Sequence, residues 1–136
     1  MRFASREWIE AVVAALHAHP DLARALDGLG RDGALVVEAE PPVFPATVAV
    51  HAAHERGRIV RWRLLADEDE VLELEPAYVL RAPYRVWKGL VQGGDPVQAA
   101  LGGRVRVEGD LEALVRRANY RYVVEAALRA VPTELP

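Results

Sequence analysis

Apolar side chains first recur at helical spacing near the start of the chain. The pattern begins after Ser5, a residue type that often caps helix N-termini, and it stops at Pro20. We predict a helix over this stretch, followed by a short helical turn over residues 21–26 that Gly28 and Gly30 end.

Three further helices are predicted in the second half of the chain. Pro83 suits the first position of a helix and Asp95 suits the N-cap of the next, and a glycine pair follows each of these segments. Asp110 caps a final helix, whose apolar stripe changes phase near Asn119. We therefore expect two short helices and one long helix after residue 83.

Extended segments occupy the middle of the chain. In the clearest of them, Trp62 and Leu64 alternate with Arg61 and Arg63, which is typical of a strand with one face exposed to solvent. Leucines and glutamates alternate in a similar way from Val71 onwards. Five strands are predicted, over residues 34–39, 47–53, 58–65, 71–81 and 104–108.

The order of these elements predicts the fold class. Helices come first, four strands follow, and then come two helices, one strand and a last helix. We predict an α+β fold with a five-stranded, mostly antiparallel or mixed sheet and helices packed over one face. At 136 residues the chain is expected to form one domain, residues 1–136, because a second core would be too small.

Composition narrows the classes of function. Hydrophobic residues make up 51% of the chain and charged residues 27%, which predicts a folded protein. The formal net charge of −3 is spread along the chain and offers no basic footprint for nucleic acid. The chain has no cysteine and no apolar run of membrane-spanning length, and Arg6, Glu7 and Glu10 interrupt the segment where a signal peptide would be apolar. We expect a soluble cytoplasmic protein without a transmembrane segment. Its basic residues are arginines apart from Lys88, which is typical of GC-rich bacterial genomes.

Residues with catalytic or metal-binding chemistry do not fall at the required spacings. His17 and His19 lie two apart on a predicted helix, and His51 and His54 lie three apart on a strand and its turn, so neither pair is expected to share an ion. Ser5, the single serine, is better used as a helix cap, which leaves no catalytic triad. We expect no catalytic residue, no metal site and no cofactor.

Two charged stretches have alternative interpretations. The acidic run at residues 67–70 lacks the spacing of a calcium loop and is typical of a solvated turn. Arg61 and Arg63 could attract an anionic head group or a membrane surface, although a sheet with one polar face is expected in any case. Neither stretch is assigned a function.

A set of large apolar side chains is predicted to point inwards. Such sets usually form ordinary core, but the same residue types also line ligand pockets, and the pattern leaves both interpretations open. The set comprises Trp62, Tyr78, Leu80, Trp87, Leu90, Leu101, Leu114 and Tyr122.

Residues 78–110 combine several specific features. An extended segment leads to a helix bearing Trp87, Gly-Gly-Asp-Pro at residues 93–96 starts the next helix, and Gly-Arg-Val-Arg-Val-Glu-Gly-Asp at residues 103–110 leads into the last one. Together these features resemble the signature region of the sterol carrier protein type 2 family, over about a quarter of the chain. The resemblance implies a five-stranded sheet with helices over one face. It also implies a hydrophobic tunnel, between sheet and helices, that binds sterols, fatty acyl chains or other lipids without catalysis.

The resemblance also assigns side chains to this tunnel. Trp62, Tyr78 and Leu80 of the inward-pointing set complete the predicted ligand-binding residues, around a cavity on the order of several hundred Å³. The side chains assigned by position are Trp87, Leu90, Val91, Leu101, Val105, Val107, Leu111, Leu114 and Val115.

Other functions stay open beside lipid binding. The domain could be an accessory module that presents a lipid or isoprenoid intermediate to a partner enzyme, or it could form a homodimer through an exposed apolar patch. A metal-dependent enzyme would need His51 or His54 to meet acids such as Glu38 or Glu55 in a cleft. In the main interpretation the partner is a lipid or another apolar small molecule, with transient contact to a membrane.

Overall fold

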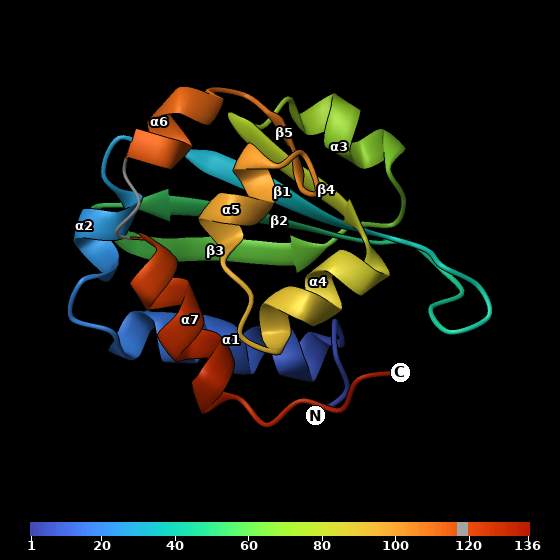
Figure 1. Ribbon diagram of the computed structural model, residues 1–136. Helices are drawn as coiled ribbons and strands as arrows, with labels where there is room; N and C mark the ends of the chain where they lie inside the picture. Colours follow the sequence, from blue (N-terminus) through green and yellow to red (C-terminus); the bar gives the residue numbers. More distant parts are fainter. Residues whose placement is uncertain (117–119) are drawn as a thin grey trace.

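A five-stranded sheet forms the centre of the protein (Figure 1). The computed structural model describes residues 1–116 and 120–136. The strands lie in the order β3-β2-β1-β4-β5; β1 and β4 are parallel and the other neighbouring pairs are antiparallel. The predicted mixed sheet of five strands is therefore confirmed. The strands are β1 (Asp32–Glu38), β2 (Val48–Glu55), β3 (Arg58–Leu64), β4 (Tyr78–Pro83) and β5 (Arg106–Glu108).

Most of the helices lie on one side of this sheet. Helices α1 and α2 contact β3, α4 contacts β1 and β4, and α7 packs across α1 and α2. Figure 1 shows α4, α5, α6 and α7 in front of the sheet. Among the described residues, no helix has the length and apolar character to cross a membrane. The helices are α1 (Arg6–Ala18), α2 (Leu22–Leu26), α3 (Asp69–Leu74), α4 (Tyr84–Val91), α5 (Pro96–Leu101), α6 (Leu111–Arg116) and α7 (Tyr120–Ala130).

The predicted caps begin three of these helices. The Ser5 hydroxyl accepts a hydrogen bond from the backbone N–H of Trp8, which starts α1. Asp95 accepts hydrogen bonds from the first free N–H groups of α5, and the Asp110 carboxylate accepts one from Ala113 in α6. Each cap satisfies a backbone donor that has no partner inside the helix. The phase change expected near Asn119 lies outside the described residues.

The predicted strand over residues 71–81 is wrong in its first half, which forms α3. The Asp67 carboxylate accepts hydrogen bonds from the N–H groups of Asp69 and Glu70, so the acidic run starts a helix. The alternation of leucines and glutamates does not reflect burial, because Leu72 is 71% exposed while Val71 is buried. Val71 packs α3 on the face of the sheet opposite to the other helices, which the prediction of helices over one face did not include.

An aromatic cluster joins the two ends of the chain to α4. The rings of Phe44 and Tyr84 stack with their centres 4.8 Å apart, and the ring of Phe3 lies 5.8 Å from that of Tyr84. The Tyr84 hydroxyl donates to the carbonyl of Pro136, and the backbone N–H of Phe3 donates to Glu134. The first turn of α4 is thereby held between the loop after β1 and both termini.

Trp87 fixes α4 to the sheet. Its indole Nε1–H lies 3.1 Å from the carbonyl oxygen of Val36 on β1 and 3.0 Å from that of Ala82 on β4. The ring also packs against two buried clusters, one of which contains Val37 and the other Ala82. One side chain therefore joins the helix to both strands of the parallel pair.

Replacing Trp87 by phenylalanine removes this donor and keeps most of the apolar contact. We expect Trp87→Phe to lower the free energy of unfolding by about 1–2 kcal/mol, since a buried hydrogen bond contributes about that much. Urea denaturation measures the change. Trp62→Phe is the matched control, because the Trp62 indole N–H makes no hydrogen bond with the described residues. An equal loss in both variants would contradict the assigned role of the Trp87 N–H.

Candidate functional site

A row of aliphatic side chains crosses all five strands on the face that most helices cover. The register places Leu64 beside Val50 and Val50 beside Leu35. It continues from Leu35 to Leu80 and from Leu80 to Val107. Paired residues of neighbouring strands point to the same side of a sheet, so the five side chains form one continuous surface. We call these five residues the apolar strip.

The helices leave the apolar strip partly open. Leu35 lies on the central strand and keeps 42% of its surface exposed, and the other four residues are half-buried. Directly next to Leu35 in the sequence, Ala34 and Val36 face the other way and are buried beneath α3. A large aliphatic residue at the centre of a covered sheet is normally buried. The helix layer therefore leaves part of the strip exposed to solvent.

The rows on either side of the strip show how far the opening extends. Towards α4, Val37 and Ala82 are buried against Trp87, which closes that end. On the other side Trp62 pairs with Ala52, Ala52 with Gly33 and Gly33 with Tyr78, and both aromatic residues are half-buried. Gly33 has no side chain and Ala52 has a single methyl group, so the middle of this row fills little space. The partly exposed surface thus covers two neighbouring rows of the sheet.

A separate pocket lies where β4 passes into α4 and the loop after α5 reaches β5. It has a volume of about 400 Å³ and is lined by three arginines, one glutamate and a small apolar wall. None of the predicted ligand-binding residues lines it. The lining residues are Glu38, Pro83, Arg85, Val86, Gly103, Arg104 and Arg106.

Three of the four histidine side chains, those of His17, His19 and His51, make hydrogen bonds with described residues. His51 Nε2 lies 2.8 Å from the Asp32 carboxylate, whose other oxygen accepts the N–H of Ala77. The ring of His17 accepts the backbone N–H of Ile59 at 3.0 Å. In the described part of the chain, no group of three or more His, Asp or Glu side chains could hold a metal ion.

Comparison with known proteins identifies the fold. No model of a known protein family matches this chain, and no curated protein sequence does. A crystal structure of sterol carrier protein 2 superposes with a TM-score of 0.78 at 22% identity, over 96% of this chain and 99% of that one. The chain has the sterol carrier protein 2 fold. The fold that the resemblance implied is thereby confirmed.

Two other structures have the same sterol carrier protein 2 fold. The solution structure of a conserved hypothetical protein from Thermus thermophilus has a TM-score of 0.75 at 22% identity and covers 93% of this chain and 88% of that one. Apo sterol carrier protein 2 from Yarrowia lipolytica has a TM-score of 0.54 at 10% identity and covers 88% of each chain. At these identities the likeness extends to the arrangement of the backbone.

The twelve predicted ligand-binding residues fall into three groups in this sterol carrier protein 2 fold. Four lie on the sheet, either in the apolar strip or in the row beside it, and six are buried or half-buried on and around α4, α5 and α6. Two are exposed on α5 and α6, where Leu101 is 54% and Leu111 39% exposed. Contact of any of them with a ligand stays a prediction. The groups are, in this order, Trp62, Tyr78, Leu80 and Val107; Trp87, Leu90, Val91, Val105, Leu114 and Val115; and Leu101 and Leu111.

Sequence reasoning missed three strip residues, Leu35, Val50 and Leu64, as site residues. Residues 34–37 are all apolar, so no polar partner marks the side on which Leu35 opens. Leu64 had a signal, since it alternates with Arg63 and shares a face with Trp62. The arginine-lined pocket had no such signal in the sequence, because its charged residues come from separate segments.

The Asp32 carboxylate is held in its charged form. Burial acts to raise the pKa of Asp32, but the hydrogen bonds from His51 and Ala77 and the charges of His51 and Arg31 outweigh it and lower that pKa. The folded protein therefore binds fewer protons at this site than the unfolded chain does. The stability that the site contributes is present above the unfolded pKa of the carboxyl and is lost as the pH falls through the folded pKa.

Replacing Asp32 by asparagine tests this linkage. Between pH 5 and about pH 3, the range in which aspartates titrate, the unfolding free energy of the wild type is expected to fall more steeply than that of Asp32→Asn. Urea denaturation at several pH values measures both slopes. Asp21→Asn is the control, since the Asp21 carboxylate has no hydrogen bond or ion pair among the described residues. The linkage is ruled out if Asp32→Asn keeps the wild-type slope.

Proposed function

We propose that this protein binds an apolar ligand against the apolar strip and catalyses no reaction. The observation that carries the proposal is the 42% exposure of Leu35 at the centre of a sheet face that helices otherwise cover. Its neighbours Val50 and Leu80 are also incompletely buried. An apolar ligand would remove this surface from water, which is the favourable part of hydrophobic binding.

The chemistry of the strip supports a carrier rather than an enzyme. All five side chains are aliphatic, so none can donate or accept a proton or act as a nucleophile. Each buried methylene contributes about 0.8 kcal/mol, so an acyl chain of roughly sixteen carbons would gain on the order of 12 kcal/mol before the costs of ordering and association. Shape and apolar surface are sufficient for such binding.

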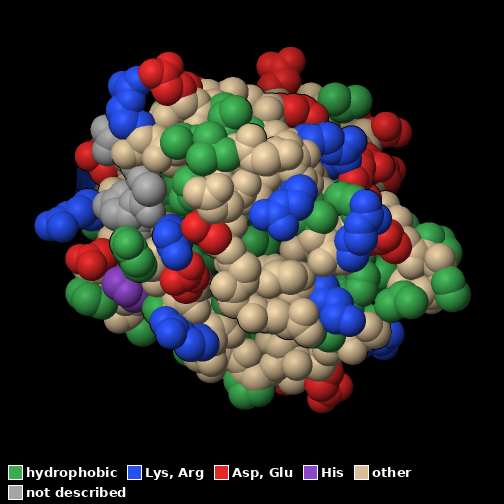
Figure 2. All heavy atoms as spheres, viewed as in Figure 1, with side chains coloured by type: hydrophobic (Ala, Val, Ile, Leu, Met, Phe, Trp, Pro, Cys, Tyr) green, Lys and Arg blue, Asp and Glu red, His purple; other side chains and the backbone are tan. Residues whose placement is uncertain are grey.

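We propose a sterol, a fatty acyl chain or another lipid as the ligand. Two of the superposed structures are named sterol carrier protein 2, which supports this class. Hydrophobic side chains gather over α5 and α6 in Figure 2, and exposed Leu101 and Leu111 come from these helices. We propose that the ligand enters here and that the protein carries it in the cytoplasm, a compartment that its cysteine-free sequence favours.

Titration with a fluorescent fatty-acyl probe tests the proposal. The wild type is expected to bind saturably. Leu35→Asp should weaken binding by at least about tenfold, because an acyl chain cannot solvate a carboxylate. The matched control is Leu72→Asp, which makes the same substitution at a more exposed leucine on α3, beyond the opposite face of the sheet. It should bind like the wild type.

A second variant separates lost binding from lost folding. Leu35→Phe fills the open space without adding charge, so it should fold with wild-type circular dichroism and still bind the probe more weakly. Two results would contradict the proposal: a wild type that does not bind saturably, or Leu35 variants that fold and bind as tightly as the wild type.

A further inference from the structure

The arginine-lined pocket has an excess of positive charge in a chain that is negative overall. Arg85, Arg104 and Arg106 line it, and Glu38 is its single acidic residue. Lys and Arg side chains gather around α4 and β5 in the view of Figure 2. Guanidinium groups bind carboxylate and phosphate through paired N–H donors. A pocket of this size and charge suits an oxyanion.

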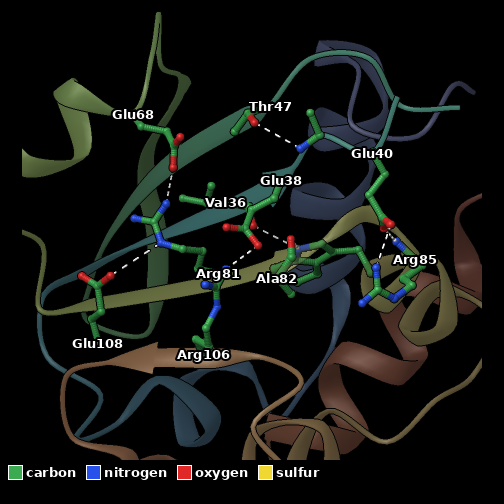
Figure 3. Close-up of polar contacts among 12 residues, drawn as sticks. Val36, Glu38, Glu40, Thr47, Glu68, Arg81, Ala82, Arg85, Arg106 and Glu108 are labelled. Atoms are coloured by element: carbon green, nitrogen blue, oxygen red, sulfur yellow. Dashed lines mark hydrogen bonds and ion pairs between the residues drawn. The ribbon is translucent and has the colours of Figure 1, made fainter. Parts of the chain in front are cut away.

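Two of the three guanidinium groups are already paired. Arg106 of β5 forms an ion pair with Glu38 of β1, and Arg85 of α4 forms one with Glu40 at 2.8 Å (Figure 3). Arg104 makes no hydrogen bond or ion pair with the residues that the structure describes. Its guanidinium donors are therefore available to a ligand.

The backbone holds Arg104 at the pocket. Gly103 has a φ of +74°, a conformation that favours glycine, and its N–H donates to the carbonyl of Ala100. On the other side of Arg104, the N–H of Val105 donates to the carbonyl of Ala99 at 3.1 Å, and the Val105 side chain is buried. Both neighbours of Arg104 are thus held by hydrogen bonds to α5. Because the backbone here is already ordered, ligand binding would lose little backbone entropy.

We propose that this pocket binds the phosphate or carboxylate group of an organic anion. Arg104 donates to the oxyanion, and Arg106 joins it when the anion displaces Glu38. Pro83 and half-buried Val86 supply an apolar wall for the carbon part of the same ligand. The proposal is independent of ligand binding at the apolar strip, since the two sets of residues do not overlap.

Two titrations at constant ionic strength test the proposal and identify the source of the anion. In the first, inorganic phosphate is added to ¹⁵N-labelled protein while amide signals are followed by NMR. In the second, the protein is mixed with phosphatidylcholine vesicles with and without phosphatidic acid, and cosedimentation is measured. Saturable shifts at Gly103, Arg104 and Val86 with phosphate indicate a soluble anion. Binding only to vesicles that contain phosphatidic acid indicates a lipid head group.

Three substitutions make the result specific to this pocket. Arg104→Gln should weaken binding by about tenfold, the low end of what a hydrogen bond to a charged group contributes. Glu38→Gln should strengthen it severalfold, because Arg106 then has no competing carboxylate. Arg58→Gln, an exposed arginine on β3 at the other edge of the sheet, should leave it unchanged. The proposal is overturned if neither probe binds saturably or if Arg58→Gln and Arg104→Gln have equal effects.

Discussion

The hydrogen bonds from the Trp87 indole to the carbonyls of Val36 and Ala82 determine where the helix layer meets the sheet. β1 and β4 are parallel, so the chain must cross over between them, and α4 follows directly after β4. Trp87 ties this helix back to both strands at one end of the pair. Val37 and Ala82 are buried there. The same contact keeps α4 at that end, and the apolar strip beyond it stays partly open.

The two faces of the sheet are covered in different ways. On the α3 face the core side chains are small, and Ala34, Val36, Ala49 and Val79 are closed over by Val71. The remaining surface there is charged, with Arg81 paired to Glu68 and Glu108 (Figure 3). The other face has larger aliphatic side chains and a helix layer that does not cover them fully. Exposed apolar surface of this kind is unfavourable in water and becomes favourable once a ligand covers it. The candidate site is therefore a consequence of incomplete packing and not of a catalytic group.

How much could be predicted from the sequence depended on whether a signal was local. The caps at Ser5, Asp95 and Asp110 act within a few residues, and they were predicted correctly. The alternation after Val71 was also local, but it misled, because glutamates of a short exposed helix mimic the polar side of a strand. The opening over Leu35 depends on where distant helices stop, and the arginine pocket brings together residues 38, 85, 104 and 106. No spacing in the sequence encodes either of these arrangements.

Isotope-filtered NMR of the protein with a bound fatty acyl chain tests the central claim most directly. Nuclear Overhauser contacts between the unlabelled chain and the labelled methyl groups report which side of the sheet the ligand occupies. The account predicts contacts to the methyl groups of Leu35, Val50 and Leu80, and none to those of Val36, Val71 or Val79 on the α3 face. Contacts confined to the α3 face, or an acyl chain bound without contact to the strip, would contradict it.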